Sequence, residues 1–205
     1  MKKILKSIYN RLNCWKFKHI TLSSRIGRGV VVYNSDNLVM EEHTNIDAGG
    51  VIMNTRAKFI MKRKSGAAIG LTVITGNHMS VVGRFFKDIT DKDKDVFDKN
   101  GELDKDVVVE EDVWIGANVT LLSGAHIGRG SIIGTASVVR SKIPPYSVVV
   151  GNPAKVIGFN FTPEEIIEHE KKLYEKSERL PLNLLERNYK KYYMDRILEI
   201  KHFFK

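Results

Sequence analysis

The sequence predicts an all-β solenoid, a parallel β-helix of six-residue repeats, followed by a helical C-terminal extension. Three observations support this prediction. Aliphatic residues recur every six positions at Ile115, Leu121, Ile127, Ile133 and Val139. Four positions after each of the first four stand Val119, Ala125, Ser131 and Ser137. At "GNPAKVIGFNFTPEEII" the six-residue spacing gives way to a helical one.

A period of six fits neither an α-helix nor a simple strand, but it fits a chain that forms a short strand, turns a corner and forms another. Three such units complete one triangular coil. The aliphatic residue points inward, the small residue fits at the corner, and Gly or Asn supplies the turn. Stacked coils form parallel strands and bury a continuous aliphatic column. We expect about six coils.

The N-terminal half shows the same period with one slip. Residues six apart are Ile20, Ile26, Val32 and Leu38, and the spacing resumes at Ile46 and Ile52. We therefore assign residues 20–158 to the β-helix, residues 1–19 to a basic N-terminal segment and residues 159–205 to the helical extension.

The extension begins with a helix start signal. Thr162, Pro163 and Glu165 predict a capping box with proline at the first helical position. One helical face carries Ile166, Ile167, Leu173 and Tyr174. Beyond Pro181, helical spacing continues through Leu185, Tyr189, Tyr193, Ile197 and Ile200. We expect a pair of helices packed against the prism or a neighbouring subunit.

The formal charge of +9 lies mostly in the first 28 and the last 40 residues. No recognition helix, zinc finger or aromatic-basic strand accompanies it, so nucleic acid is not an expected partner. The basic N-terminal segment is interpreted as a packed end-cap, with peripheral membrane contact as the alternative. Polar residues interrupt its apolar stretch, and no run of 18 apolar residues occurs, so a cytoplasmic location is expected. Cys14 is the only cysteine, which excludes an internal disulfide.

Residues 107–158, "VVVEEDVWIGANVTLLSGAHIGRGSIIGTASVVRSKIPPYSVVVGNPAKVIG", resemble the hexapeptide-repeat acyltransferases. They are most similar to the branch of maltose, galactoside, nodulation and capsule O-acetyltransferases and the xenobiotic acetyltransferases. The ordered motifs "DVWIG", "IIGTASVV" and "PPYSVVVGNPAKVI" carry the resemblance. It implies a left-handed β-helix, a homotrimer, acetyl coenzyme A as acyl donor between adjacent prisms, and no required metal.

The resemblance also implies that the histidine of the "N-H" pair is the catalytic base. Here the pair is Asn77 and His78, directly before the repeat breaks off. A neutral imidazole can take the proton of a sugar hydroxyl as that hydroxyl attacks a thioester carbonyl. Asn77 is expected to position the acceptor or the histidine. The alternative is a turn residue on the prism surface.

The donor site is predicted from the same resemblance. Trp114, expected at a corner, is assigned to the wall around the acyl end, with interface packing as the alternative. The backbone at Gly116, Gly134 and Thr135 is expected to approach the pantetheine arm closely because these residues are small. The phosphates are expected to meet Lys142 and Lys155.

Residues 83–106 interrupt the repeat with eight acidic and six basic side chains, which predicts an extruded loop. Phe85 and Phe86 are expected to anchor its base, and we interpret it as a lid over a neighbouring subunit's acceptor pocket. Its acidic spacing imitates a calcium loop, but Val96 stands where that loop needs glycine and Lys99 at a coordinating position. Calcium binding is therefore not expected.

The remaining histidines are interpreted as solvated: His19, His43, His126 at a corner, His169 and His202. The prism of a zinc carbonic anhydrase needs three converging histidines, which this pattern does not predict. The favoured function is O-acetylation of a saccharide: a polysaccharide, glycolipid precursor or oligosaccharide. An antibiotic acceptor, N-acetylation of a nucleotide-linked sugar and a non-catalytic trimeric scaffold are the alternatives. Serine acetyltransferase is disfavoured because its long helical leader is missing.

Overall fold

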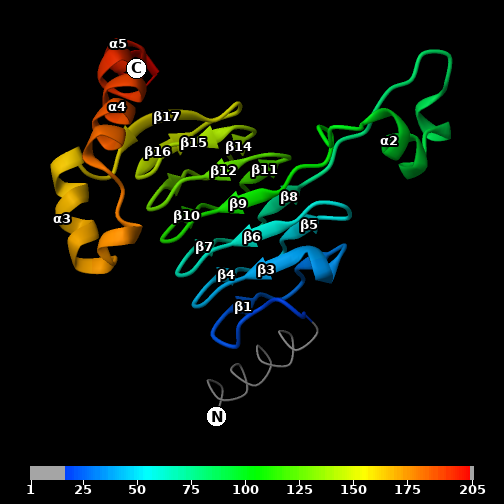
Figure 1. The fold of residues 1–205 in the computed structure, drawn as a ribbon, viewed down its shortest axis with the longest axis horizontal. Helices are drawn as coiled ribbons and strands as arrows, with labels where there is room; N and C mark the ends of the chain where they lie inside the picture. Colours follow the sequence, from blue (N-terminus) through cyan, green and yellow to red (C-terminus); the bar gives the residue numbers. More distant parts are fainter. Residues whose placement is uncertain (1–16, 204–205) are drawn as a thin grey trace.

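In a computed structural model, which describes residues 17–203, three sheets form the sides of a triangular prism (Figure 1). The β1 sheet has the order β1 (Arg25–Ile26), β4 (Asn45–Ile46), β7 (Gly66–Ala67), β10 (Trp114–Ile115), β13 (Ile132–Ile133), β16 (Ser147–Val150) and β17 (Lys155–Phe159). The β2 sheet has the order β2 (Val31–Val32), β5 (Val51–Met53), β8 (Thr72–Ile74), β11 (Thr120–Leu122) and β14 (Val138–Val139). The β3 sheet has the order β3 (Leu38–Met40), β6 (Phe59–Met61), β9 (Val107–Val109), β12 (His126–Ile127) and β15 (Lys142–Ile143).

Successive strands visit the three sheets in strict rotation. One complete coil takes one strand from each sheet, so the two five-stranded sheets define five complete coils, and β16 begins a sixth. Neighbouring strands within a sheet are parallel, except that β17 pairs antiparallel with β16 and ends the β1 sheet. The predicted parallel β-helix is confirmed.

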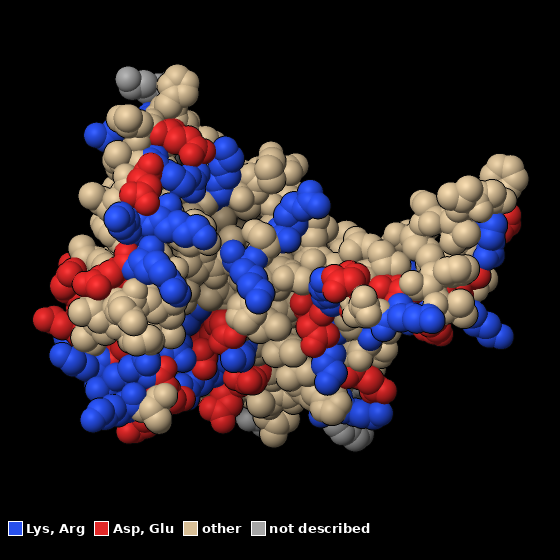
Figure 2. Space-filling model, turned by 45° about the horizontal axis from the view of Figure 1, so that its top comes forward, with Lys and Arg blue, Asp and Glu red and all other residues tan. Residues whose placement is uncertain are grey.

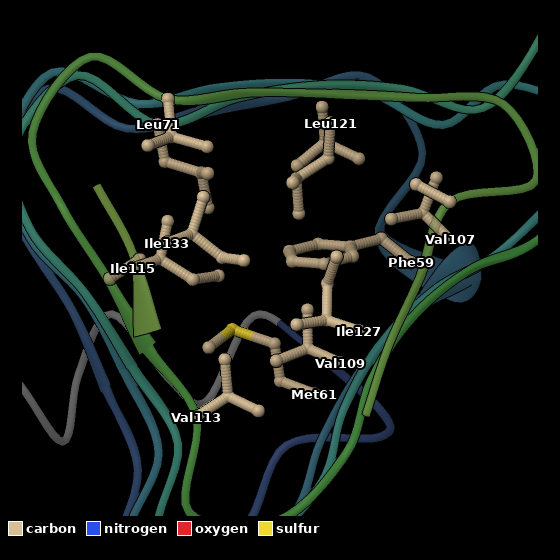
Figure 3. Packing of buried hydrophobic residues seen from close by; sticks show 14 of the residues in the cluster. Phe59, Met61, Leu71, Val107, Val109, Val113, Ile115, Leu121, Ile127 and Ile133 are labelled. Carbon is tan, nitrogen blue, oxygen red and sulfur yellow. The ribbon is translucent and has the colours of Figure 1, made fainter. Parts of the chain in front are cut away.

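The prism interior is a single aliphatic column. Ile115, Leu121, Ile127 and Ile133 are fully buried, and Val139 nearly so, which confirms the six-residue period. Figure 3 shows Ile115, Leu121 and Ile127 pointing inward from different walls, with the Phe59 ring between them. The expected corner residues Val119, Ala125, Ser131 and Ser137 are also fully buried. Each coil thus covers the apolar surface of the next.

The corner between the β1 and β2 sheets requires left-handed backbone. We call it the glycine corner, because Gly29, Gly49 and Gly70 stand there with positive φ, joined by Asn118 and Ala136. At Gly70 a Cβ would also run into Asn118 of the next coil. Glycine here therefore satisfies both the turn and the close stacking of coils.

The corner between the β2 and β3 sheets, which we call the arm corner, releases residues 75–106 between β8 and β9. The predicted extruded loop begins at residue 83, whereas the chain leaves the prism directly after Ile74. Its ends pair as a short stem: Asn77 N donates to Leu103 O (2.9 Å), Lys105 N donates to Thr75 O (3.0 Å), and Gly76 bridges Asp104. Residues 77–103, the arm, project away from the prism (Figure 1).

The arm contains one short 3-10 helix, η2 (Phe86–Asp88), and one helix that the sequence did not predict, α2 (Asp91–Phe97). Thr90 and Asp93 form the capping box of α2, and no α2 residue is buried. Ion pairs hold the arm instead. Arg84 Nη1 lies 2.6 Å from Asp93 Oδ1, and Lys94 Nζ lies 3.0 Å from Asp104 Oδ1.

Arg56, on the prism between β5 and β6, links the arm to its own chain. Its Nη2 lies 2.5 Å from Asp95 Oδ1 on α2, and its Nε lies 2.9 Å from Asp104 Oδ2 in the stem. Figure 2 shows acidic and basic side chains intermingled where the arm meets the prism. Exposed ion pairs contribute only about 0–1 kcal/mol each, so the arm is fixed far more weakly than the core.

The C-terminal tail, residues 159–203, forms three helices, so the prediction of a pair is wrong. They are α3 (Pro163–Leu173), α4 (Leu182–Tyr192) and α5 (Ile197–Phe203), with 3-10 turns η3 (Lys176–Glu178) and η4 (Met194–Arg196) between them. The capping box at Thr162 and Glu165 is present. Ile166 and Tyr174 are buried as predicted, but Leu173, the last residue of α3, is 57% exposed.

Helix α3 docks on the third corner, between the β3 and β1 sheets, through a buried carboxylate. Glu170 is fully buried and accepts hydrogen bonds from Tyr146 Oη (3.1 Å), Arg129 Nη1 (3.3 Å) and Leu180 N (2.5 Å). The Arg129 guanidinium also stacks 4.0 Å from the Tyr174 ring centroid. Burial raises the pKa of Tyr174 to about 12. Three donors offset the cost of burying the Glu170 charge, so this contact fixes the tail on the prism.

Among residues 17–203, none of the helices combines the length and apolar content needed to cross a bilayer.

Candidate functional site

His78 is the second residue of the arm, directly above the stem. Both Asn77 and His78 are exposed. They line a depression of about 540 Å³ between the prism wall, represented by Met53 and Ile74, and the underside of the arm. Because β8 ends at Ile74, His78 lies where the chain leaves the prism and enters the arm.

The arm contributes one aromatic contact to His78. The Phe86 ring meets the imidazole edge to face, with centroids 4.7 Å apart and planes at 74°. Phe86 thus contacts the base of the arm as expected, although it remains 51% exposed. Phe85 is 83% exposed, so its predicted anchoring within this chain is wrong.

Asn77 is bound to the stem. Its Nδ2 donates to Leu103 O (3.1 Å), the carbonyl that also accepts from Asn77 N. The amide NH₂ thus closes the arm at its root, and through that contact it fixes where the next residue, His78, leaves the stem.

Lys142 lies farther along the same arm corner, whereas Lys155 begins β17 at the end of the β1 sheet, opposite Val150. In the β2 sheet the strand order rises from β8 through β11 to β14, after which the chain turns this corner into Lys142, the first residue of β15. Two coils, each rising about 4.8 Å, separate His78 from this level, roughly 10 Å in all. Both lysines line one depression of about 310 Å³.

A carboxylate already stands in that depression. Glu199 of α5 lies 3.0 Å from Lys155 Nζ through its Oε1, and Arg196 also lines the space. The carboxylate oxygens of Glu199 resemble those of a phosphate in charge and in hydrogen-bonding capacity. The cations therefore fit an anionic group of that kind.

Trp114, Gly116, Gly134 and Thr135 lie on other parts of the prism. Trp114 is the outward residue of β10 on the β1 sheet, 51% exposed, so its predicted corner position is wrong. The other three lie at the glycine corner. The predicted donor residues therefore form two groups: Lys142 and Lys155 line one depression, and Gly116, Gly134 and Thr135 lie at the glycine corner.

The glycines at this corner have a packing explanation. A Cβ on Gly116 would stand 2.7 Å from Thr135 N, and a Cβ on Gly134 would stand 2.7 Å from Val150 Cγ1. Close stacking of consecutive coils therefore requires glycine at both positions, whether or not a ligand approaches.

Two histidines differ from expectation. His126 is the outward residue of strand β12, not a corner residue, and its Nε2 lies 2.9 Å from Glu110 Oε1. That bond, with Lys62, lowers the pKa of Glu110 to about 2. His169 is not solvated as predicted: its ring packs against Tyr146, and its Nε2 is shielded from solvent without a hydrogen-bond partner in the described chain.

Within residues 17–203, no group of three or more His, Cys, Asp and Glu side chains is arranged to hold a metal ion. The acidic residues of the arm instead pair with Arg56, Arg84 and Lys94.

A profile described as bacterial transferase hexapeptide (six repeats) matches residues 106–141. The chain carries the hexapeptide repeat of the bacterial transferases. This confirms the resemblance that the sequence motifs indicated.

Similar hexapeptide-repeat proteins include a chloramphenicol acetyltransferase of Klebsiella aerogenes, 44% identical over 72 residues, which are 35% of this chain and 32% of that protein. Another, from Escherichia coli K12, is named for lipopolysaccharide biosynthesis O-acetyl transfer and is 45% identical over 71 residues, 35% of this chain and 33% of that protein. The matched segment thus spans about a third of the length of these relatives.

Two solved structures share the hexapeptide-repeat fold. One is an acetyltransferase of Vibrio cholerae in complex with acetyl coenzyme A, with a TM-score of 0.55 and 24% identity, covering 72% of this chain and 74% of that one. The other is a maltose O-acetyltransferase of Clostridium difficile 630, with a TM-score of 0.56 and 20% identity, covering 73% and 86%. The fold is the left-handed parallel β-helix with a helical extension.

Sequence reasoning missed Arg196, Glu199 and Asp104. The first two were assigned only to the helical tail, and their one sequence signal is the i,i+3 spacing of opposite charges. Asp104 was one of eight acids in the loop, and nothing in the pattern distinguishes it as the residue that binds both Arg56 and Lys94.

Proposed function

We propose that the chain is an acetyl-coenzyme A-dependent O-acetyltransferase that acts on a saccharide hydroxyl, with His78 as general base. The observation that carries this proposal is the arrangement at the arm corner. An exposed histidine lines a depression, and a second, cationic depression includes Lys142, which follows the same corner two coils farther along the prism. A long donor with an acyl group at one end and phosphates at the other matches that arrangement.

The proposed step is the transfer of an acetyl group from sulfur to oxygen. His78 takes the hydroxyl proton of the acceptor while the hydroxyl oxygen attacks the thioester carbonyl carbon. The new O–C bond forms, the C–S bond breaks, and the coenzyme leaves as a thiolate, which is protonated by the imidazolium. Positioned general-base catalysis contributes about 10²–10⁴-fold, and holding two substrates side by side supplies further acceleration. Phe86 holds one edge of the imidazole, and Asn77 fixes its starting point on the stem.

The division of the donor residues between two corners supports a homotrimer. Lys142 lies at the arm corner, whereas Gly116, Gly134 and Thr135 lie at the glycine corner, and one ligand would meet both sets between two copies. A cyclic trimer brings the arm corner of each prism to the glycine corner of the next and closes without a free face. Trp114 then belongs to the wall supplied by the neighbour, and the arm reaches over that neighbour as a lid.

The acceptor depression favours a saccharide. Tyr33 and Phe86 supply aromatic faces, while Thr55, Thr90 and Asp91 supply hydroxyl and carboxylate groups. Sugars bind by stacking their apolar faces on aromatic rings and hydrogen-bonding their hydroxyls to such groups. The relative named for lipopolysaccharide O-acetyl transfer points the same way. The chloramphenicol acetyltransferases favour an antibiotic as the second candidate.

The test is release of free thiol from acetyl coenzyme A in the presence of a panel of saccharides and antibiotics. His78→Ala should retain its assembly and coenzyme affinity but lose about two to four orders of magnitude in kcat. His43→Ala, a turn residue away from both depressions, is the matched control. Normal turnover by His78→Ala would exclude it as the base. A stable, active monomer by mass measurement would exclude the site between prisms.

A further inference from the structure

Where α5 meets the prism, Arg196 and Glu199 stand beside Lys155, and the proposed function assigns no part to either of them. Glu199 lies between two cations. Its Oε1 is 3.0 Å from Lys155 Nζ and 3.0 Å from Arg196 Nη2, and its Oε2 is 2.9 Å from Arg196 Nε. The guanidinium thus grips both carboxylate oxygens, the bidentate geometry that arginine also uses for phosphate.

Arg196 belongs to the wall of this depression independently of Glu199. Its Nη1 donates to the backbone carbonyl of Val156 in β17 (3.1 Å) and to that of Tyr192 (3.5 Å). These bonds orient the guanidinium toward Lys155 whether or not the carboxylate is present. The depression therefore has three cations around one space, Lys142, Lys155 and Arg196, of which Arg196 is anchored by backbone carbonyls.

Glu199 is attached more loosely than the cations it meets. It lies on α5, the last described helix, in which Ile200 is the one buried residue. Leu198 and Phe203 of the same helix are exposed. The Glu199 side chain itself is half exposed. Moving this carboxylate out of the depression therefore disturbs little of the core.

We propose that the Glu199 carboxylate occupies, in the free chain, the position that a phosphate group of the coenzyme takes when it binds. Arg196 then joins Lys142 and Lys155 as a phosphate ligand, and α5 carries a built-in competitor for its own donor site. This inference rests on the proposed function.

The competitor is charged throughout the working pH range. The bonds from Arg196 and then Lys155 lower the pKa of Glu199 to about 2. Competition therefore does not depend on protonation near neutral pH. Coenzyme A brings several negative charges against one, so it displaces Glu199 at a modest cost in affinity.

The experiment compares Glu199→Gln with wild type by calorimetric titration of coenzyme A and of pantetheine, which lacks the phosphates. The variant keeps the size of the side chain and removes its charge. Exposed ion pairs are weak, so we expect coenzyme A to bind about two- to fivefold more tightly and pantetheine to bind unchanged. Glu186→Gln, an exposed residue of α4 outside the depression, is the matched control and should equal wild type.

A double-mutant cycle sharpens the result. In a Lys155→Gln background, the gain from Glu199→Gln should shrink, because one of the two cations that Glu199 masks is gone. An undiminished gain would show a general charge effect and overturn the inference.

Inorganic pyrophosphate separates this inference from the proposed function. If wild type binds coenzyme A and Glu199→Gln binds it no better than Glu186→Gln, Glu199 is not a competitor and the function stands. If neither protein binds coenzyme A but Glu199→Gln gains affinity for pyrophosphate, the masked anion site stands and the proposed function is overturned. If neither ligand binds either protein, both proposals are overturned.

Discussion

The prism and the arm are held by opposite means. In the prism, one continuous cluster of buried aliphatic side chains runs through every coil. In the arm, helix α2 buries no residue, and ion pairs such as Arg56 with Asp95 and Lys94 with Asp104 hold it in place. The stabilisation from burial scales with the apolar area removed from water, whereas exposed ion pairs are weak and are screened by salt. One chain therefore combines a rigid scaffold with an element that opens at little cost.

The largest effect should come from the same substitution made in both regions. Phe59→Ala in the prism removes a fully buried ring that fills the core, and it should lower the free energy of unfolding by about 3–5 kcal/mol. Phe97→Ala at the end of α2 removes a ring that is 59% exposed, and it should change that free energy by less than about 0.5 kcal/mol. Urea denaturation at a fixed subunit concentration measures both. Equal losses of stability in the two variants would contradict the contrast between a buried prism core and an exposed arm.

A smaller effect should follow from cutting the arm's link to the prism. Arg56→Gln removes the bonds to Asp95 and Asp104, while the urea midpoint should stay almost constant. Amide exchange at Asn77 and Lys105, the two stem donors, should accelerate about five- to thirtyfold, as expected for the loss of about 1–2 kcal/mol.

Arg28→Gln, an exposed charge on the prism, is the control for that variant and should leave stem exchange unchanged. High salt should reproduce the effect of Arg56→Gln on wild type, because it screens the same pairs. Unaltered stem exchange in Arg56→Gln would mean that backbone bonding alone holds the arm.

The smallest effect should appear in acid. Arg84 and the Thr90 backbone hold the pKa of Asp93 well below its ordinary value, and the Leu103 amide lowers that of Asp98. A carboxyl group whose pKa is lowered in the folded state stabilises that state. This stabilisation is fully present above the pKa of the group in the unfolded chain, about 4, and is lost as the pH falls through its pKa in the folded chain. Exchange in the arm, corrected for its intrinsic pH dependence, should therefore accelerate below about pH 4, before exchange in the core. Asp93→Asn should reduce that dependence.

The repeat predicted the prism because each coil meets the same demand: an aliphatic residue inward and a small one at the corner. The period alone does not specify which of the other positions lie on a strand. Trp114 and His126 each directly precede the inward aliphatic residue, so they are outward strand residues and not corner residues. A six-residue pattern also leaves the three corners equivalent. Assigning a residue to the arm corner or the glycine corner requires counting every coil through the irregular turns near residues 34–37 and 54–58.

The tail and the charged contacts escaped prediction for other reasons. Helical spacing runs on past Tyr192, but the backbone leaves the helical region at Tyr193 (φ −124°, ψ −65°), which divides the expected second helix into α4 and α5. The bond between Lys155 and Glu199 joins residues 44 positions apart. Such a contact depends on where α5 docks, and charge patterning detects only neighbours on one helix.

The exit and return of the chain at the arm corner leave the coils above and below undisturbed. Strand β9 pairs with β6 and β12 in continuous register, Ile60 with Val108 and Val108 with His126, as though residues 75–106 were absent. The corner is in effect a splice point. Segments of different length and composition can be exchanged there without changing the register of any coil. The part of the protein that we propose meets the acceptor is therefore free to diversify while the stacked coils that would receive the donor stay the same.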